Sequence, residues 1–237
     1  MQARTVFVTG SSRGIGLAIA RQLSADGFHV ILHGTPGSED FLRGLVAEID
    51  NSSYRVFDLC ENPESAFRQV IKEFDGLYGL INNAGAMASE SFFDTTYEDL
   101  EQLFRINTFS HFILSREFMN QAGLVEGRIV NISTNVIKYG HGRNNTIQYT
   151  SSKLALEAIT AGLSKLGAKQ GVLVNTVRPG TVNTRMQQQR EDLQARLEMI
   201  PLKRMVEPSE IAELVGFLLS EKSSYITGQT ICIAGGE

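Results

Sequence analysis

The fold of this chain is decided by the stretch Thr9-Gly10-Ser11-Ser12-Arg13-Gly14-Ile15-Gly16. An apolar, strand-like run at 5–9 leads into it, and a helical pattern at 15–25 follows. Gly10 permits a tight turn, Gly14 lets the backbone approach a pyrophosphate, and Gly16 lets the helix pack closely on the strand. The spacing differs from Gly-x-Gly-x-x-Gly, so a glycine-rich turn that binds nothing is the alternative. The position between strand and helix favours a dinucleotide site.

Outward from this stretch, apolar runs alternate with helical patterns along the whole chain. Strands are predicted at 5–9, 29–33, 54–57, 79–82, 128–132, 172–177 and 230–233. Helices are predicted at 15–25, 39–49, 63–74, 97–121, 147–169 and 208–219. This alternation predicts an α/β fold, a single Rossmann-type doubly wound domain over 1–237 with a seven-stranded parallel sheet between helices. The irregular stretch 181–206 is predicted to be a helical excursion or lid over the site.

Composition excludes several classes of protein. Hydrophobic residues make up 42% and charged residues 20%, which is typical of a globular chain. The net charge is −4 and there is no basic run, so we expect no nucleic-acid partner. No apolar stretch approaches 18 residues and the N-terminus leaves no room for a signal peptide, so we expect no membrane span. Cys60 and Cys232 lie far apart and are predicted to be reduced and buried, which fits a cytoplasmic protein.

A second segment, Gln148-Tyr149-Thr150-Ser151-Ser152-Lys153, carries the predicted chemistry. In a helix, Tyr149 and Lys153 lie on one face, one turn apart. A phenol beside a fixed ammonium has a pKa below its usual value of about 10. Such a tyrosine donates a proton to a carbonyl oxygen or takes one from an alcohol. A solvated helix face is the alternative interpretation of this spacing.

Several motifs together resemble the short-chain dehydrogenase/reductase family. Besides the two segments above, they are Asn82-Asn83-Ala84-Gly85, Asn107 and Arg178-Pro179-Gly180, and their order and spacing match over essentially the whole chain. The chain looks most like the 3-oxoacyl-(acyl carrier protein) reductase type, including Ile226-Thr227-Gly228-Gln229 before the last strand. The resemblance implies an NADP(H)-dependent oxidoreductase that transfers a hydride between the nicotinamide and a ketone or secondary alcohol.

The resemblance also implies roles for individual residues. Tyr149 is the general acid or base, and Lys153 lowers its pKa and holds the nicotinamide ribose. Asn107 anchors a water that leads protons to Lys153. Asp58-Leu59 flanks adenine, 83–85 passes under the ribose, and 179–184 meets the nicotinamide. The cofactor-binding residues are then Gly10, Ser12, Arg13, Gly14, Ile15, Gly16, Thr35, Asp58, Leu59, Asn83, Ala84, Gly85, Tyr149, Lys153, Pro179, Gly180, Val182 and Thr184.

The substrate-orienting hydroxyl departs from the family pattern. The family's serine aligns with Thr134, which precedes Tyr149 by 15 residues, two more than usual. A threonine keeps the hydroxyl that holds a substrate oxygen. The insertion leaves Ser133 as the alternative. The lengthened loop 135–147 contains His141 and Asn144-Asn145, and it either contacts substrate or is simply solvated. A lone histidine does not indicate a metal site, and none is predicted.

The end of the second predicted strand decides the cofactor. An acidic residue there would bind the ribose 2′-hydroxyl of NAD. This chain has His33-Gly34-Thr35-Pro36 instead, with its first carboxylates at Glu39 and Asp40. Arg13 can pair with a 2′-phosphate, and Thr35 or His33 can add a donor. These residues favour NADP. The alternative is that Arg13 is simply a surface residue without a role in cofactor binding.

The sequence leaves the substrate open. In the resembling carrier-protein reductases, basic docking residues precede the fifth and sixth strands, and here those places hold Val125-Glu126 and Gln170, with Lys169 adjacent. Acyl carrier protein is therefore a weakly supported partner. A small carbonyl or alcohol substrate, including a sugar- or polyol-like one, is the alternative, and a non-catalytic cofactor sensor is a third. Apolar side chains on 97–121 and 147–169 predict a homotetramer or dimer. They are Phe104, Phe112, Phe118, Leu156, Ile159 and Leu163.

Overall fold

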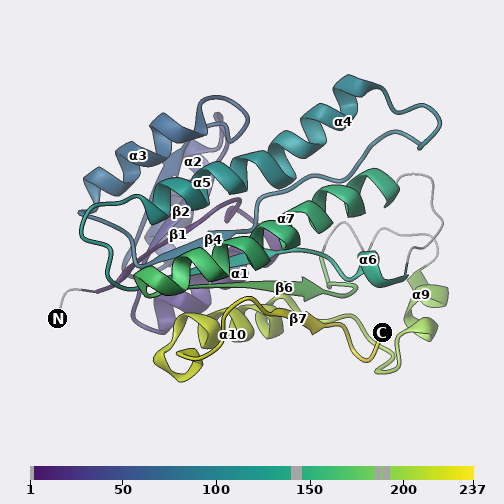
Figure 1. Ribbon diagram of the computed structural model, residues 1–237. Helices are drawn as coiled ribbons and strands as arrows, with labels where there is room; N and C mark the ends of the chain where they lie inside the picture. The colour runs from purple at the N-terminus through teal and green to yellow at the C-terminus, as the bar shows by residue number, and fades with distance from the viewer. Residues whose placement is uncertain (1–2, 140–145, 185–187, 189–192) are drawn as a thin grey trace.

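The structure is a computed structural model that describes residues 3–139, 146–184, 188 and 193–237. One sheet of seven parallel strands forms its centre, in the order β3-β2-β1-β4-β5-β6-β7 (Figure 1). The strands are β1 Thr5–Val8, β2 His29–Gly34, β3 Ser52–Val56, β4 Gly79–Asn82, β5 Gly127–Ile132, β6 Val172–Pro179 and β7 Thr230–Ile233. The predicted doubly wound, seven-stranded parallel sheet is confirmed.

Helices cover both faces of the sheet. Those described are α1 Gly14–Ala25, α2 Glu39–Glu48, α3 Pro63–Glu73, α4 Tyr97–Phe104, α5 Ser110–Met119, α6 Val136–Tyr139, α7 Thr146–Gly167, α9 Leu193–Met199 and α10 Pro208–Leu219. Apolar side chains of α1, α2 and α10 pack on one face, and those of α3, α5 and α7 pack on the other. The strands are buried on both sides, which explains why they occur as continuous apolar runs rather than as alternating ones.

The long helix predicted at 97–121 is interrupted. A π-helical turn at Arg105–Phe109 separates α4 from α5, and it contains Asn107. Single π turns inserted in helices are common at functional sites. The insertion is not visible in hydrophobic periodicity, because the apolar pattern continues through it. The short helix α6 lies in the predicted loop 135–147, and α9 lies in the stretch predicted as a lid.

Two predictions about burial are wrong in part. Phe118 and Leu156 are fully buried, so they are not part of an apolar outer surface. The exposed apolar side chains near them are Phe109, Phe112, Leu154 and Leu166. The two cysteines are free, but Cys60 is only partly buried and Cys232 is exposed. Cys232 is exposed because β7 is an edge strand with alternating exposure.

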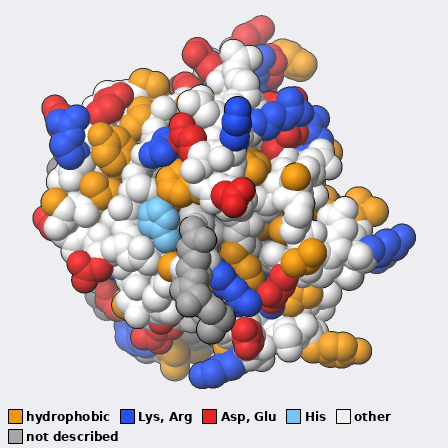
Figure 2. All heavy atoms as spheres, turned by 90° about the vertical axis from the view of Figure 1, so that its left-hand side faces the viewer, with side chains coloured by type: hydrophobic (Ala, Val, Ile, Leu, Met, Phe, Trp, Pro, Cys, Tyr) orange, Lys and Arg blue, Asp and Glu red, His pale blue; other side chains and the backbone are white. Residues whose placement is uncertain are grey.

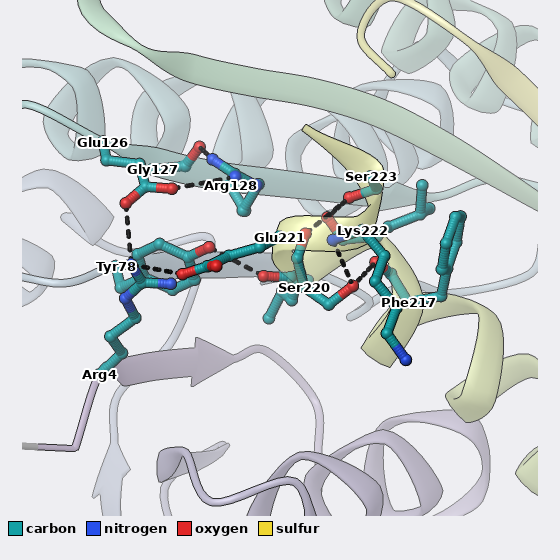
Figure 3. Close-up of polar contacts among 12 residues, drawn as sticks. Arg4, Tyr78, Glu126, Gly127, Arg128, Phe217, Ser220, Glu221, Lys222 and Ser223 are labelled. Carbon is teal, nitrogen blue, oxygen red and sulfur yellow. Dashed lines mark hydrogen bonds and ion pairs between the residues drawn. The ribbon is translucent and has the colours of Figure 1, made fainter. Parts of the chain in front are cut away.

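The amino ends of the strands are closed by a polar cluster. Arg4 stacks on the Tyr78 ring at 4.3 Å and binds Glu126 at 3.0 Å, while the Tyr78 hydroxyl donates to Leu219 O at 2.8 Å (Figure 3). Glu126 also accepts from Arg128. The side of the molecule that includes this edge carries interspersed acidic and basic side chains (Figure 2). These contacts fix the edge opposite the one that holds the predicted site.

In Figure 1 the arrows of β6 and β7 point to the right, toward α6 and α9. The strand order reverses between β1 and β4, and such a switch point is where doubly wound sheets bind ligands. Within the described ranges, no helix is long and apolar enough to cross a bilayer. The same residues contain no group of three metal-ligating side chains.

Candidate active site

The glycine segment forms a compact turn between β1 and α1. Gly10 and Gly14 have positive φ angles of 60° and 56°, which disfavour any side chain. A Cβ on Gly16 would lie 2.4 Å from Gly10 O. The Thr9 hydroxyl accepts hydrogen bonds from the amides of Asn83 and Ala84, both at 2.9 Å. Thr9 therefore ties the glycine turn to the loop after β4.

His33 also supports the glycine turn, through a hydrogen bond to its ring. Its Nδ1 accepts from the Gly10 amide at 3.2 Å, and its Nε2 donates to Phe57 O at 3.1 Å. Burial lowers the pKa of His33 to about 4, so the ring is neutral at physiological pH. Both ring nitrogens are engaged, so the prediction that His33 can add a donor for a 2′-phosphate is wrong. Thr35, at the exposed end of β2, retains that possibility.

Asn107 shapes the loop after β4 by two reciprocal bonds. Its Oδ1 accepts from the Ala86 amide and its Nδ2 donates to Ala86 O, both at 2.9 Å. Nδ2 also donates to Ser152 Oγ at 3.0 Å. The π turn aims this fully buried side chain inward. A Cβ on Gly85 would lie 2.9 Å from Asn107 Oδ1, so the loop can follow this path only with glycine there.

Tyr149 and Lys153 lie one turn apart on α7, as predicted, but the expected effect on the phenol is not seen. Burial raises the pKa of Tyr149, and a hydrogen bond with Thr134 opposes that rise. Lys153 is not among the causes of this shift, and its Nζ donates to Ile132 O at 2.9 Å. Burial lowers the pKa of Lys153 itself to about 8. The ammonium lies beside Gly85, since a Cβ there would be 3.2 Å from Nζ.

The two candidate hydroxyls at the end of β5 have different partners. Thr134 bonds with the Tyr149 phenol and accepts from the Val136 amide at 3.3 Å. Ser133 donates to Glu157 Oε1 at 2.6 Å, and Glu157 also accepts from Arg178 Nε at 2.7 Å. Thr134 therefore shares a hydrogen bond with the candidate acid, whereas Ser133 belongs to a separate ionic group.

These residues surround one cavity of about 720 Å³ at the carboxyl edge of the sheet. Its lining includes Arg13, Ile15, Asn83, Gly85, Thr134, Tyr149, Lys153, Pro179, Gly180, Val182 and Thr184. The cavity runs from the glycine turn, past the loop after β4, to the segment after β6. That is the donor set that a dinucleotide needs: a helix N-terminus at one end, an ammonium in the middle and a hydroxyl pair beside it.

Other predicted cofactor residues lie outside this lining. Asp58 accepts from the Cys60 amide at 2.7 Å and lines an adjoining cavity of about 490 Å³, which shares Ala86 and Met87 with the first, while Leu59 is buried in the core. Gly10 and Gly16 act through the backbone of the turn. His141, Asn144 and Asn145, for which substrate contact is one of the two predicted alternatives, lie outside the described residues.

Sequence reasoning did not assign a role to several residues of the site. The sequence motifs give Thr9 no role beyond the start of the glycine segment, and they give none to Glu157. Asn135 and Arg196 line the same cavity and were not predicted. The one sequence feature that points to Asn135 as a site residue is its position directly after the predicted fifth strand. Arg196 lies in the stretch without clear periodicity, and no pattern there points to the site.

Comparison with known proteins gives a consistent result. Residues 10–237 match the family model described as enoyl-(acyl carrier protein) reductase. The 3-oxoacyl-(acyl-carrier-protein) reductase of Aquifex aeolicus is 36% identical, covering 100% of this chain and 98% of that protein. The acetoacetyl-CoA reductase of an Acinetobacter species is 34% identical over 99% and 98%. A blue fluorescent protein from a metagenomic library, solved with NADPH, superposes with a TM-score of 0.91 at 29% identity, covering 98% and 97%.

Proposed function

This chain belongs to the short-chain dehydrogenase/reductase family of oxidoreductases, and we propose that it reduces a ketone, or oxidises a secondary alcohol, with NADP(H) at the cavity around Tyr149. The observation that carries the proposal is the joint placement of Thr134, Tyr149 and Lys153 on one cavity with the glycine turn. The solved relative that contains NADPH supports this choice of cofactor.

Different residues of the chain have different roles in the reduction. When bound, the nicotinamide would supply the hydride. Thr134 holds the substrate oxygen, and Tyr149 donates the proton that this oxygen gains as the carbonyl carbon accepts the hydride. Lys153 holds the ribose hydroxyls beside Gly85, and Asn107 keeps the loop after β4 in the path that leaves room for them. A proton on a buried phenol of raised pKa is available for donation at neutral pH.

Turnover against a carbonyl panel tests the proposal. Purified enzyme should oxidise NADPH, followed at its absorbance band, with at least one short ketone or 3-oxo ester. Binding alone, seen as a change in NADPH fluorescence without any turnover across the panel, would favour the non-catalytic sensor. Carrier-protein substrates belong in the panel, because two relatives are named for 3-oxoacyl and acetoacetyl thioesters.

The structure also bears on whether the substrate is attached to an acyl carrier protein. Glu126 lies at the amino edge of the sheet, bound to Arg4 and Arg128, and Lys169 lies just before β6 at the same edge. Tyr149 lies at the carboxyl edge. Within one chain these positions therefore do not border the cavity mouth. A small carbonyl substrate needs no such docking site, and we propose it as the substrate class.

Replacing Arg13 tests the cofactor preference. Arg13 is the exposed N-cap residue of α1 and lines the cavity. We expect NADPH to bind at least tenfold more tightly than NADH, a difference of about 1.4 kcal/mol, because its 2′-phosphate pairs with this guanidinium. In Arg13→Ala most of the preference should disappear in fluorescence titrations. Arg21→Ala, on the same helix but paired with Glu48, is the matched control and should keep it. A wild type that prefers NADH would contradict the assignment.

The lowered pKa of Lys153 predicts how cofactor binding depends on pH. With a pKa of about 8, the ammonium is mostly charged at pH 7 and mostly neutral at pH 9. The charged form binds ribose hydroxyls more strongly, so the dissociation constant of NADPH should rise about tenfold from pH 7 to pH 9. Lys153→Met should bind more weakly and show a flat profile over this range. A wild-type profile that is equally flat would contradict the role of the charge.

We also propose that the chain forms a homotetramer in which α4–α5 and α7 pair with their copies. Phe109, Phe112, Leu154 and Leu166 are between 46% and 58% exposed on these neighbouring helices, and symmetric pairing covers such surfaces. Light scattering at micromolar concentration should give four times 26.1 kDa. Phe112→Glu should lower the mass, whereas Phe41→Glu, at an exposed site on α2, should not. A monomeric wild type would contradict this proposal.

A further inference from the structure

We propose that the substrate carries a carboxylate close to its carbonyl group, and that Asn135 and Arg196 bind this carboxylate. This inference rests on the proposed function, because it concerns the substrate end of the same cavity. A carboxylate there distinguishes the proposed substrate from the neutral esters or thioesters that other enzymes need beside the carbonyl group. Four observations support it: an unpaired buried amide, a guanidinium with a free edge, the position of both, and the charge of the lining.

The amide of Asn135 has no partner within the protein. The residue is 1% exposed, and neither Oδ1 nor Nδ2 makes a hydrogen bond to any part of the chain that the structure describes. Its backbone amide donates to Pro179 O at 2.8 Å, which fixes the residue at the cavity wall. Buried polar groups are nearly always paired, so this unpaired amide, closed to solvent in a residue that lines the cavity, can gain its missing partner from a ligand when the side chain turns toward the cavity.

Arg196 presents a buried guanidinium to the same cavity. Its side chain is 8% exposed, Nε donates to Thr181 Oγ1 at 3.1 Å, and Nη2 pairs with the carboxylate of Glu237. These two contacts occupy the side edge of the guanidinium. Nη1 makes no hydrogen bond to a residue in the described ranges. The end edge is therefore available for a second carboxylate, for which the planar fork is well suited.

Both groups lie at the substrate end of the cavity. Thr181, the partner of Arg196, directly follows Gly180, and a Cβ on Gly180 would lie 3.4 Å from Glu237 Oε2. Asn135 directly follows Thr134, which bonds with Tyr149. The segment at 179–184 is the one assigned to the nicotinamide. Arg196 and Asn135 are thus placed beside the reacting centre, at the end away from Arg13.

The charge of the lining favours an anion. Among the lining residues that the structure describes, Arg13, Lys153 and Arg196 are basic and none is a carboxylic acid. Arg13 and Lys153 are assigned to the cofactor, so Arg196 is the cation left for the substrate. A cavity walled by one sign of charge attracts ligands of the other. Glu237 pairs with Nη2 of Arg196, is 3% exposed and leaves Oε2 unpaired, so its negative charge reduces this attraction.

A matched pair of substrates tests the inference: acetoacetate, which is an anion, and methyl acetoacetate, which is neutral. We expect wild type to have a kcat/KM at least tenfold higher for acetoacetate, mainly through KM. Arg196→Gln should lower kcat/KM for acetoacetate by about 10- to 100-fold and change the ester less than threefold, since one charge-assisted contact is lost. Asn135→Leu should also lower kcat/KM for acetoacetate, by about tenfold. Arg204→Gln, an exposed neighbour paired with Glu210, should change neither.

Glu237→Gln gives a prediction of opposite sign. Removing the counter-charge while keeping an acceptor should lower KM for acetoacetate several-fold, and this variant carries the test if Arg196→Gln does not fold. Acetoacetate binding to the enzyme with NADP⁺, where no turnover occurs, should follow the same order in equilibrium dialysis. Equal losses for both substrates in Arg196→Gln, or no wild-type preference, would overturn the inference while leaving the proposed function intact. Failure to reduce any ketone would overturn the proposed function, and this inference with it.

Discussion

Tyr149→Phe should lower turnover by roughly 10²–10⁴-fold, the usual effect of removing a positioned acid. The substitution keeps the ring that packs against the cavity wall and removes only the proton donor. NADPH affinity should change little, because Lys153 and the glycine turn are untouched. Stopped assays of turnover and fluorescence titration of NADPH measure the two properties separately.

The control for this variant is Lys153→Ala. We expect it to weaken NADPH binding and turnover together, because the ammonium beside Gly85 is assigned to the ribose as well as to the proton path. A full-rate Tyr149→Phe enzyme would mean that another group, or water, delivers the proton. The mechanism proposed above would then be wrong, although the cofactor site would stand.

Thr134→Val should be the second most damaging change, with a loss of roughly 10²-fold or more in kcat. Valine has nearly the shape of threonine but lacks the hydroxyl that holds the substrate oxygen and bonds with Tyr149. Losing that bond also leaves the desolvation of the phenol unopposed, so any pH dependence that reports Tyr149 should move to higher pH. Initial rates at saturating substrate across pH 6–10 measure both effects.

Two neighbouring variants make this prediction specific. Thr134→Ser keeps the hydroxyl and should retain most activity. Ser133→Ala removes a bond to Glu157, which lies in a separate ionic group with Arg178, and should change activity only a few-fold. Full activity in Thr134→Val together with a large loss in Ser133→Ala would transfer the orienting role to Ser133.

Local patterns in the sequence were sufficient for the sheet. Strands buried on both faces must be continuous apolar runs, and the helices between them must be amphipathic, so the alternation was visible along the chain. Boundaries differ by only a few residues. For example, β3 begins at Ser52 rather than at Tyr54, and β6 extends to Pro179. The π turn at Arg105–Phe109 was not predictable, because one inserted residue does not disturb an apolar pattern that continues on both sides.

For the site, the sequence identified the residues whose function depends on their spacing along the chain. The glycines must have their spacing for the turn to form, and Tyr149 and Lys153 must be four apart to share a helix face. It predicted that Lys153 lowers the pKa of Tyr149, and that direction is wrong. Burial raises that pKa, and burial is a property of the packed site rather than of the spacing.

By itself, then, the sequence determined the parallel sheet, the glycine turn at its first strand and the tyrosine–lysine pair on α7, since each depends on residues close together in the chain. The tertiary structure decided everything that depends on which way a side chain points and what distant residue meets it. It turned Thr134 toward Tyr149 and Ser133 toward Glu157, engaged both nitrogens of His33, and brought Arg196 and Glu237 together beside Gly180. Such contacts join segments tens of residues apart, and their geometry is set by packing rather than by any local pattern.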